Sequence, residues 1–450
     1  MKKDVLKYYY FILLPFVSFG QVNFPTAPSV PTPATPNIIV QNNVNQNRNP
    51  QPNSVPQNYN PQYLKQMQTF EQDRQRIEQE EKIKKETNTD IVNEGFNIKY
   101  SLPSLSNLDG TKAYYDAFDK MITLDENNYS VKDINFLIEN AYFNNTQSKD
   151  KFDKFVKVAG DFLRAKMKEL NYDSNNNSAK NYILFKFFSE TLALKNSQVN
   201  RHLPFKYDFN DFRGAKDWSK MFVSKLIDTH SGQCHSMPLL YLILAEELNA
   251  EAYLSFSPNH TYIKFKDSKN KWYNVELTNG MLTADSFVLN NGYIKAEALQ
   301  NKIYMQNLSE KELLSEFYVD LANGYIHKFG YDGFVEKVIN KALELYPNNI
   351  SAQMIKANYN TERFQYVMNQ LGIDPSDKKQ LQRIKEYPKV IELLNQTNTQ
   401  YNDIDNLGFT QMPEEEYKQW LNSLKDAKKK QDNEVLNKNL NISIKIKRLD

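Results

Sequence analysis

The only cysteine of this 450-residue chain, Cys234, is followed by a histidine and a glutamate at spacings suited to catalysis, His260 and Glu276. A thiolate can attack a carbonyl, an imidazole can take the released proton and return it, and a carboxylate can orient the imidazole and stabilise its charged form. The order nucleophile, base, acid therefore predicts a catalytic triad that works through a thioester acyl-enzyme.

The residues around Cys234 predict that the thiol stands at the start of a helix. Pro238 precedes the apolar run LLYLILAEEL, and proline is tolerated in a first helical turn because its missing N–H would have had no partner there. We expect the helix to begin at about His235 and to end near Asn249. Unpaired N–H groups and the helix dipole at this end stabilise a thiolate, and Gly232 permits the tight approach of the chain.

Three segments after this helix, AYLSFS, TYIKFK and WYNVELT, are rich in aromatic and β-branched residues and predict three short antiparallel strands. Side chains alternate along a strand, so His260 and Glu276 share a face only if the second turn has an odd number of residues. A three-residue loop over 267–269 would put the two directly opposite each other. An even loop would separate them and remove the triad.

These features resemble the transglutaminase-like superfamily of papain-type cysteine enzymes. The matching residues are a Gly-Gln-Cys segment ending at Cys234, then His260, then Trp272 with Glu276 four positions later, all within 217–280. The resemblance implies an α+β fold with a helix on an antiparallel sheet, and a reaction at an amide of a protein or peptide substrate with water or an amine as acceptor. No metal or cofactor is implied. The family more often has aspartate as the acid.

An oxyanion formed in such a reaction would be held by the N–H of Cys234 and one further donor. Gln233 and Trp218 are the candidates for that donor, and His235 is expected to be a wall or specificity residue. The full set of candidates for oxyanion stabilisation or substrate binding is Gln233, His235, Trp218, Asn274 and Trp272.

Other interpretations of these residues stay open. Histidine and cysteine are zinc ligands, so a metal cluster is one alternative, formed by His230, Cys234, His235 and His260. Cys234 could also be a small apolar residue in a core. At the level of function, the alternative to an enzyme is a non-catalytic cell-envelope scaffold or binding protein that retains the fold. The intact triad favours the enzyme.

The amino terminus predicts export. Lysines precede an apolar run of about a dozen residues with small residues at its end, as in a secretory signal peptide, whereas a membrane-spanning helix needs roughly 20 residues. An uncleaved anchor is the alternative. We expect a periplasmic, cell-surface or secreted protein with no stable membrane span after cleavage. In an oxidising compartment a lone cysteine has no disulfide partner within the chain, which favours a reactive thiol.

The rest of the chain predicts several helical regions around this domain. The formal net charge of +2, from 56 basic and 54 acidic residues, gives no reason to expect a nucleic-acid partner; the expected partner is a protein or peptide substrate, or a cell-envelope protein. We expect a signal peptide over 1–20, a disordered Pro/Asn/Gln-rich spacer over 21–62, a charged helix over 63–95, a helical region over 96–200, the transglutaminase-like domain over 201–300, a helical tetratricopeptide-like region over 301–375 and a helical C-terminal region over 376–450.

Three features of the C-terminal half carry more specific expectations. The segment KALELYPNNISAQMIKANY resembles the junction between tetratricopeptide units. Near the end, Pro413 followed by three glutamates predicts a helix start. The terminal NISIKIK, residues 441–447, alternates as a strand would.

Overall fold

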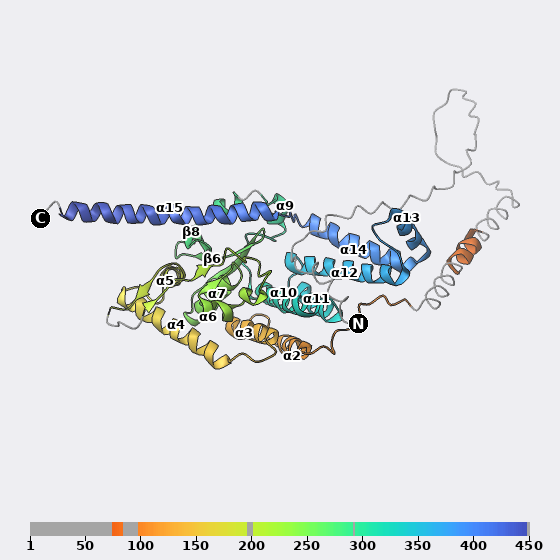
Figure 1. Cartoon of the computed structure of the whole chain (residues 1–450), viewed down its shortest axis with the longest axis horizontal. Coiled ribbons are helices and arrows are strands. Elements are labelled where there is room, and N and C mark those ends of the chain that lie inside the picture. The colour runs from red at the N-terminus through yellow and green to blue at the C-terminus, as the bar shows by residue number, and fades with distance from the viewer. Residues whose placement is uncertain (1–73, 84–97, 196–200, 291–292, 448–450) are drawn as a thin grey trace, which may run out of the picture. The chain divides into compact units, whose positions relative to one another are not determined.

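The computed structural model of the chain describes residues 74–83, 98–195, 201–290 and 293–447 (Figure 1). The predicted signal peptide and proline-rich spacer lie outside the described residues. Of the predicted charged helix, the described residues 74–83 are helical. Within the described part of the chain, no helix has both the length and the apolar character needed to cross a membrane.

The fold is mixed, largely helical with small sheets, as the α+β prediction requires. The helices are α2 (Thr111–Met121), α3 (Val131–Tyr142), α4 (Lys149–Glu169), α5 (Asn177–Ser189), α6 (Val223–Thr229), α7 (Ser236–Glu247), α8 (Asp285–Leu289), α9 (Ala296–Gln300), α10 (Glu310–Phe329), α11 (Gly333–Leu345), α12 (Ile350–Leu371), α13 (Lys378–Leu381), α14 (Pro388–Asn406) and α15 (Glu414–Lys447), with 3-10 turns η3 (Trp218–Met221) and η4 (Gln382–Glu386). The strands are β1 (Leu192–Ala193), β2 (Arg201–His202), β3 (Lys206–Tyr207), β4 (Ser231–Gly232), β5 (Tyr253–Ser257), β6 (His260–Lys266), β7 (Trp272–Glu276) and β8 (Met281–Thr283).

Helix α7 is the centre of the part that holds Cys234. Its side chains from Met237 to Ala245 are all buried. A helix that is apolar on every face must be enclosed, and α7 contacts helices α3, α4, α5 and α6 as well as strands β5 and β6. The predicted helix is thus confirmed, with its start one residue after His235 and its end two residues before Asn249.

The three predicted strands form an antiparallel sheet of order β5-β6-β7-β8, in which β8 was not predicted. The turn between β6 and β7 has the predicted three-residue length but lies over 268–270 instead of 267–269. Asp267 N donates to Lys271 O at 2.9 Å, and Asn270 takes the left-handed conformation with φ 63°, the usual third residue of such a loop.

This one-residue displacement changes the strand register by two residues. Ile263 pairs with Val275 and Lys264 with Asn274, so the prediction that His260 lies directly opposite Glu276 is wrong. The turn still has an odd number of residues, however, so the side chains of His260 and Glu276 lie on the same face of the sheet. They are diagonal neighbours across the strand pair.

The C-terminal half is helical, as predicted, but ends differently. Helix α11 packs against α10 and α12, and the tetratricopeptide-like assignment stays a prediction. Helix α15 begins at Glu414, immediately after Pro413, which confirms the predicted start. Residues 441–447 continue α15, so the strand prediction is wrong there: a helix pairs its backbone groups internally, whereas a strand needs a neighbouring edge.

Candidate functional site

Cys234 lies in the short turn that joins β4 to α7. Strand β4 pairs in parallel with β3, with Gly232 beside Tyr207. A Cβ atom at Gly232 would lie 2.6 Å from Ser236 Oγ and 2.9 Å from Leu226 Cδ1, which are distances that require atoms to move. The glycine therefore permits the close packing that holds the cysteine turn against the start of α7.

Replacing Gly232 by alanine is expected to destabilise the fold by about 1–3 kcal/mol, because the added methyl overpacks a filled site. Thermal or denaturant unfolding measures the loss. The matched control is Gly333→Ala, since a Cβ there meets nothing within 4 Å. An equal effect of the two substitutions would contradict the proposed role of Gly232.

His260 opens β6 and Glu276 ends β7, and their side chains form a buried pair. Nε2 of His260 lies 2.7 Å from Oε2 of Glu276, and each residue exposes only 4% of its surface. The other carboxylate oxygen, Oε1, accepts the N–H of Thr278 at 2.9 Å. The remaining ring nitrogen, Nδ1 of His260, makes no hydrogen bond of good geometry with a described residue, but the imidazole interacts with the thiol of Cys234. Because Glu276 holds Nε2, Nδ1 is the atom that can exchange a proton with the thiol.

The charges of the three residues are interdependent. Burial alone would lower the pKa of His260, but the Glu276 carboxylate and the Cys234 thiol outweigh burial and raise it to about 10. Burial would raise the pKa of the Cys234 thiol, but interactions with His260, Tyr417 and the N–H of Thr261 lower it. The pKa of Glu276 is also lowered, since the charge of His260 outweighs its burial. These directions favour a thiolate–imidazolium pair at neutral pH.

Three aromatic residues complete the surroundings of the triad. Tyr417 on α15 places its hydroxyl 3.8 Å from Cys234 Sγ, and the Trp420 ring meets the His260 ring edge-on with centroids 4.7 Å apart. Tyr207 on β3 is buried, and its hydroxyl interacts electrostatically with Cys234 and Tyr417. None of the three was predicted from the sequence, although the apolar spacing of Tyr417, Trp420, Leu421 and Leu424 marks one helix face.

The two sequence-predicted oxyanion candidates have structural contacts elsewhere. Gln233 is fully buried, and its Nε2 donates to the carbonyl oxygen of Asp211 at 3.1 Å. Trp218 stacks on His327 with ring centroids 5.0 Å apart. The structure thus places Trp218 against α10 instead of against the thiol, and the side-chain amide of Gln233 holds the loop before η3.

The two candidates on β7 share the face of Glu276, as predicted, but bind neighbours farther along the sheet. Asn274 donates from Nδ2 to Oδ1 of Asp285 at 3.0 Å. Trp272 meets the ring of Tyr253 with centroids 5.8 Å apart. Asn274 therefore connects β7 to the start of α8, and Trp272 packs against β5. No contact of either residue with the thiol is seen.

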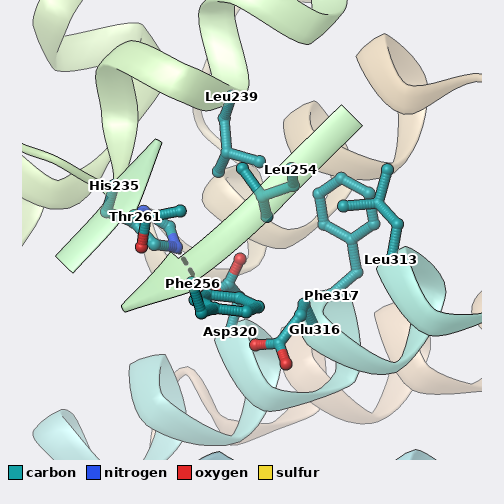
Figure 2. A pocket seen from close by; sticks show the side chains of 9 residues that line it. All are labelled: His235, Leu239, Leu254, Phe256, Thr261, Leu313, Glu316, Phe317 and Asp320. Carbon is teal, nitrogen blue, oxygen red and sulfur yellow. Dashed lines mark hydrogen bonds and ion pairs between the residues drawn. The ribbon is translucent and has the colours of Figure 1, made fainter. Parts of the chain in front are cut away.

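His235 belongs to a second polar cluster beside the triad, with two acids of α10. Its Nε2 lies 2.8 Å from Oδ1 of Asp320 and its Nδ1 lies 2.9 Å from Met221 O. Figure 2 shows these side chains around a cavity whose wall also includes Glu316 and Phe256. The cavity holds about 20 Å³, room for about one water molecule. It is too small to receive a substrate. The His235 side chain itself is 28% exposed, and its role as a wall or specificity residue stays a prediction.

Glu316 is expected to make the stability of the fold fall as pH rises. Burial and the nearby charge of Asp320 raise the pKa of Glu316 to about 8, despite the charge of His235. The folded state then holds a proton that the unfolded state releases, so stability is lost as pH rises from the ordinary carboxyl pKa of about 4.3 through about 8. Thermal unfolding across this range should show a shallower decline in Glu316→Gln. An unchanged slope would contradict the buried neutral carboxyl.

The zinc alternative gains no support from the geometry. In the described ranges, no group of three or more histidine, cysteine, aspartate or glutamate side chains is placed to hold a metal ion. His230 instead stacks on Phe205, with ring centroids 5.3 Å apart.

Comparisons of the chain with models of protein families, with curated proteins and with solved structures found no match in any of the three. The functional argument therefore rests on the geometry of the site.

Proposed function

We propose that this protein is an exported cysteine enzyme of the transglutaminase-like kind, an amide hydrolase or acyltransferase acting on protein or peptide substrates. The observation that carries the proposal is the buried His260–Glu276 pair, whose histidine also interacts with the thiol of Cys234. A histidine needed only for packing would gain nothing from a buried carboxylate beside it, because taking that charge out of water adds a desolvation cost.

The proposed reaction begins with the thiolate of Cys234 attacking the carbonyl carbon of a substrate amide. The C–N bond breaks as His260 gives its Nδ1 proton to the departing nitrogen, and a thioester is left on the enzyme. Water or a primary amine then loses a proton to His260 and attacks the thioester, which releases the acid or the new amide and restores the thiolate of Cys234 beside a protonated His260. Glu276 orients the ring and stabilises the imidazolium in both steps.

Tyr207 is the residue we propose as the second oxyanion donor, beside the N–H of Cys234. Its hydroxyl is buried near the thiol, where it interacts with Cys234 and Tyr417, and it makes no hydrogen bond of good geometry with a described residue. An unsatisfied buried donor is costly, and a developing oxyanion would supply the missing acceptor. Gln233 and Trp218 are replaced by Tyr207 in this proposal.

The proposal is tested by trapping the acyl-enzyme. The protein is incubated with a mixture of glutamine-containing peptides, with and without a fluorescent primary amine, and intact mass is measured for an adduct on Cys234. Because α15 lies over the thiol, the same assay is run on Leu421→Asp, in which a buried apolar contact of that helix is lost. We expect an adduct that is absent in Cys234→Ala and His260→Ala. Its absence from both the wild-type and the Leu421→Asp proteins would favour a non-catalytic scaffold of the cell envelope.

A further inference from the structure

Residues 412–424, hereafter the covering segment, lie directly over the triad. Four of their side chains are almost fully buried: Met412 exposes 5%, Tyr417 1%, Leu421 3% and Leu424 1%. Tyr417 also packs on the ring of Phe212, with centroids 5.3 Å apart. In Figure 1 helix α15 is the long blue helix, of which the covering segment includes the first turns.

Polar side chains on both sides of the triad hold the main chain of the covering segment. Asn259, the residue before His260, donates from Nδ2 to the carbonyl oxygen of Met412 at 3.2 Å. Asn279, in the loop between β7 and β8, donates from Nδ2 to the carbonyl oxygen of Leu424 at 3.4 Å. Carbonyl groups at the two ends of the segment are therefore bound by amides that flank His260 and Glu276.

The contacts at the centre of the segment obstruct chemistry at the thiol. A reacting carbonyl carbon must come within about 3–3.5 Å of the nucleophile, yet the Tyr417 hydroxyl lies 3.8 Å from Cys234 Sγ. Trp420 covers one edge of the His260 ring. A substrate amide could not enter while these two side chains keep their places.

We propose that the surface beneath the covering segment is the substrate surface of the enzyme, that it binds a polypeptide, and that the covering segment occupies it in the resting protein as an internal inhibitor. The inference rests on the proposed function. The occupant indicates the class of substrate: a polypeptide with bulky aromatic and leucine side chains over the triad, and main-chain carbonyls for Asn259 and Asn279.

The test compares two variants of adjacent residues. Leu421→Asp places a carboxylate on the buried face of the segment, which opposes docking, whereas Asn422→Asp places the same group on its exposed face. Alkylation of the single cysteine by iodoacetamide at neutral pH is the readout. We expect labelling of Leu421→Asp to be about tenfold faster or more than that of Asn422→Asp and wild type. Equal rates in a folded Leu421→Asp protein would overturn the proposal.

Unfolding of the variant would also expose the thiol, and a double variant separates the two causes. In a folded, opened site the fast labelling depends on the thiolate–imidazolium pair, so Leu421→Asp with His260→Ala should label slowly. Fast labelling that persists in the double variant would mean general unfolding. Leu424→Ala, a milder substitution of another buried residue of the segment, is then measured in its place, and unchanged labelling in that variant would overturn the proposal.

A synthetic peptide of residues 411–426 tests whether the surface recognises a polypeptide. Added to the Leu421→Asp protein, it should slow alkylation, and the same peptide with Tyr417→Ala should slow it less. No protection by either peptide would overturn the assignment of the substrate class. If Leu421→Asp is labelled fast but forms no acyl adduct, the proposed function is contradicted and the inhibitory role of the covering segment is supported. If wild type and Leu421→Asp form equal amounts of adduct, the proposed function is supported and the inhibitory role is contradicted.

Discussion

Replacing Glu276 by glutamine is expected to lower the rate of acyl-enzyme formation by about 10³–10⁴-fold, if loss of the acid acts here on the scale that it has in serine enzymes. Glutamine keeps the size of the side chain but removes the charge that outweighs burial and raises the pKa of His260. The imidazolium then loses its stabilisation in a site where both residues are buried. The rate is measured in the Leu421→Asp background, where the covering segment is displaced.

The same substitution should move the ionisation of Cys234 in a known direction. His260 lowers the pKa of the thiol against the effect of burial. Without the charge of Glu276 the histidine loses its proton more easily and lowers the thiol pKa less. The thiolate should therefore appear at higher pH, toward the ordinary thiol pKa of about 8.5. Thiolate absorbance in the far ultraviolet, referenced to Cys234→Ala, reports one group because the chain has one cysteine. Glu276→Asp, which keeps the charge, is the matched control. An unshifted titration in Glu276→Gln would contradict the ion pair.

The parts of the site that are formed by residues close together in the chain could be predicted from the sequence. Proline in the first turn and the fully apolar run after it predicted α7 within two residues at each end. Alternation along β6 and β7 predicted which side chains share a face. The exact register was missed because Asp267 extends the ladder by one pair, bonding to Lys271, and because Asn270 is the residue that takes the left-handed conformation. Asparagine tolerates the left-handed conformation that glycine usually provides, so the position of Asn270 could have been used to predict where the turn lies.

The parts that could not be predicted depend on contacts between distant segments. The pairing of β3 with β4, which brings Tyr207 beside the cysteine turn, links two-residue strands with no recognisable pattern. Helix α15 was expected, and its apolar face can be read from the spacing of Tyr417, Trp420, Leu421 and Leu424. The surface that this face packs against cannot be predicted from the sequence, because an amphipathic pattern indicates only that one face of the helix is buried.

Tyr207→Phe is the prediction that separates catalysis from packing most directly. The substitution removes one hydroxyl that makes no hydrogen bond of good geometry with a described residue. If that hydroxyl stabilises the oxyanion, acyl-enzyme formation in the Leu421→Asp background should fall by about 10²–10³-fold. Stability should stay the same or rise slightly, because an unsatisfied buried group is lost. Any shift of the thiolate titration should be small beside that of Glu276→Gln, since His260 is the leading group that lowers the pKa of Cys234 and Tyr207 only adds to it.

The matched control for Tyr207 is Tyr318, a fully buried tyrosine of α10 whose hydroxyl also lacks a partner. Tyr318→Phe should share the neutral effect on unfolding temperature and leave the rate unchanged. If Tyr207→Phe loses rate and its thiolate titration shifts as far as that of Glu276→Gln, the hydroxyl acts by stabilising the thiolate before the reaction and not by stabilising the oxyanion. A rate equal to that of Tyr318→Phe would remove Tyr207 from the mechanism, and the oxyanion would then depend on main-chain N–H groups at the start of α7.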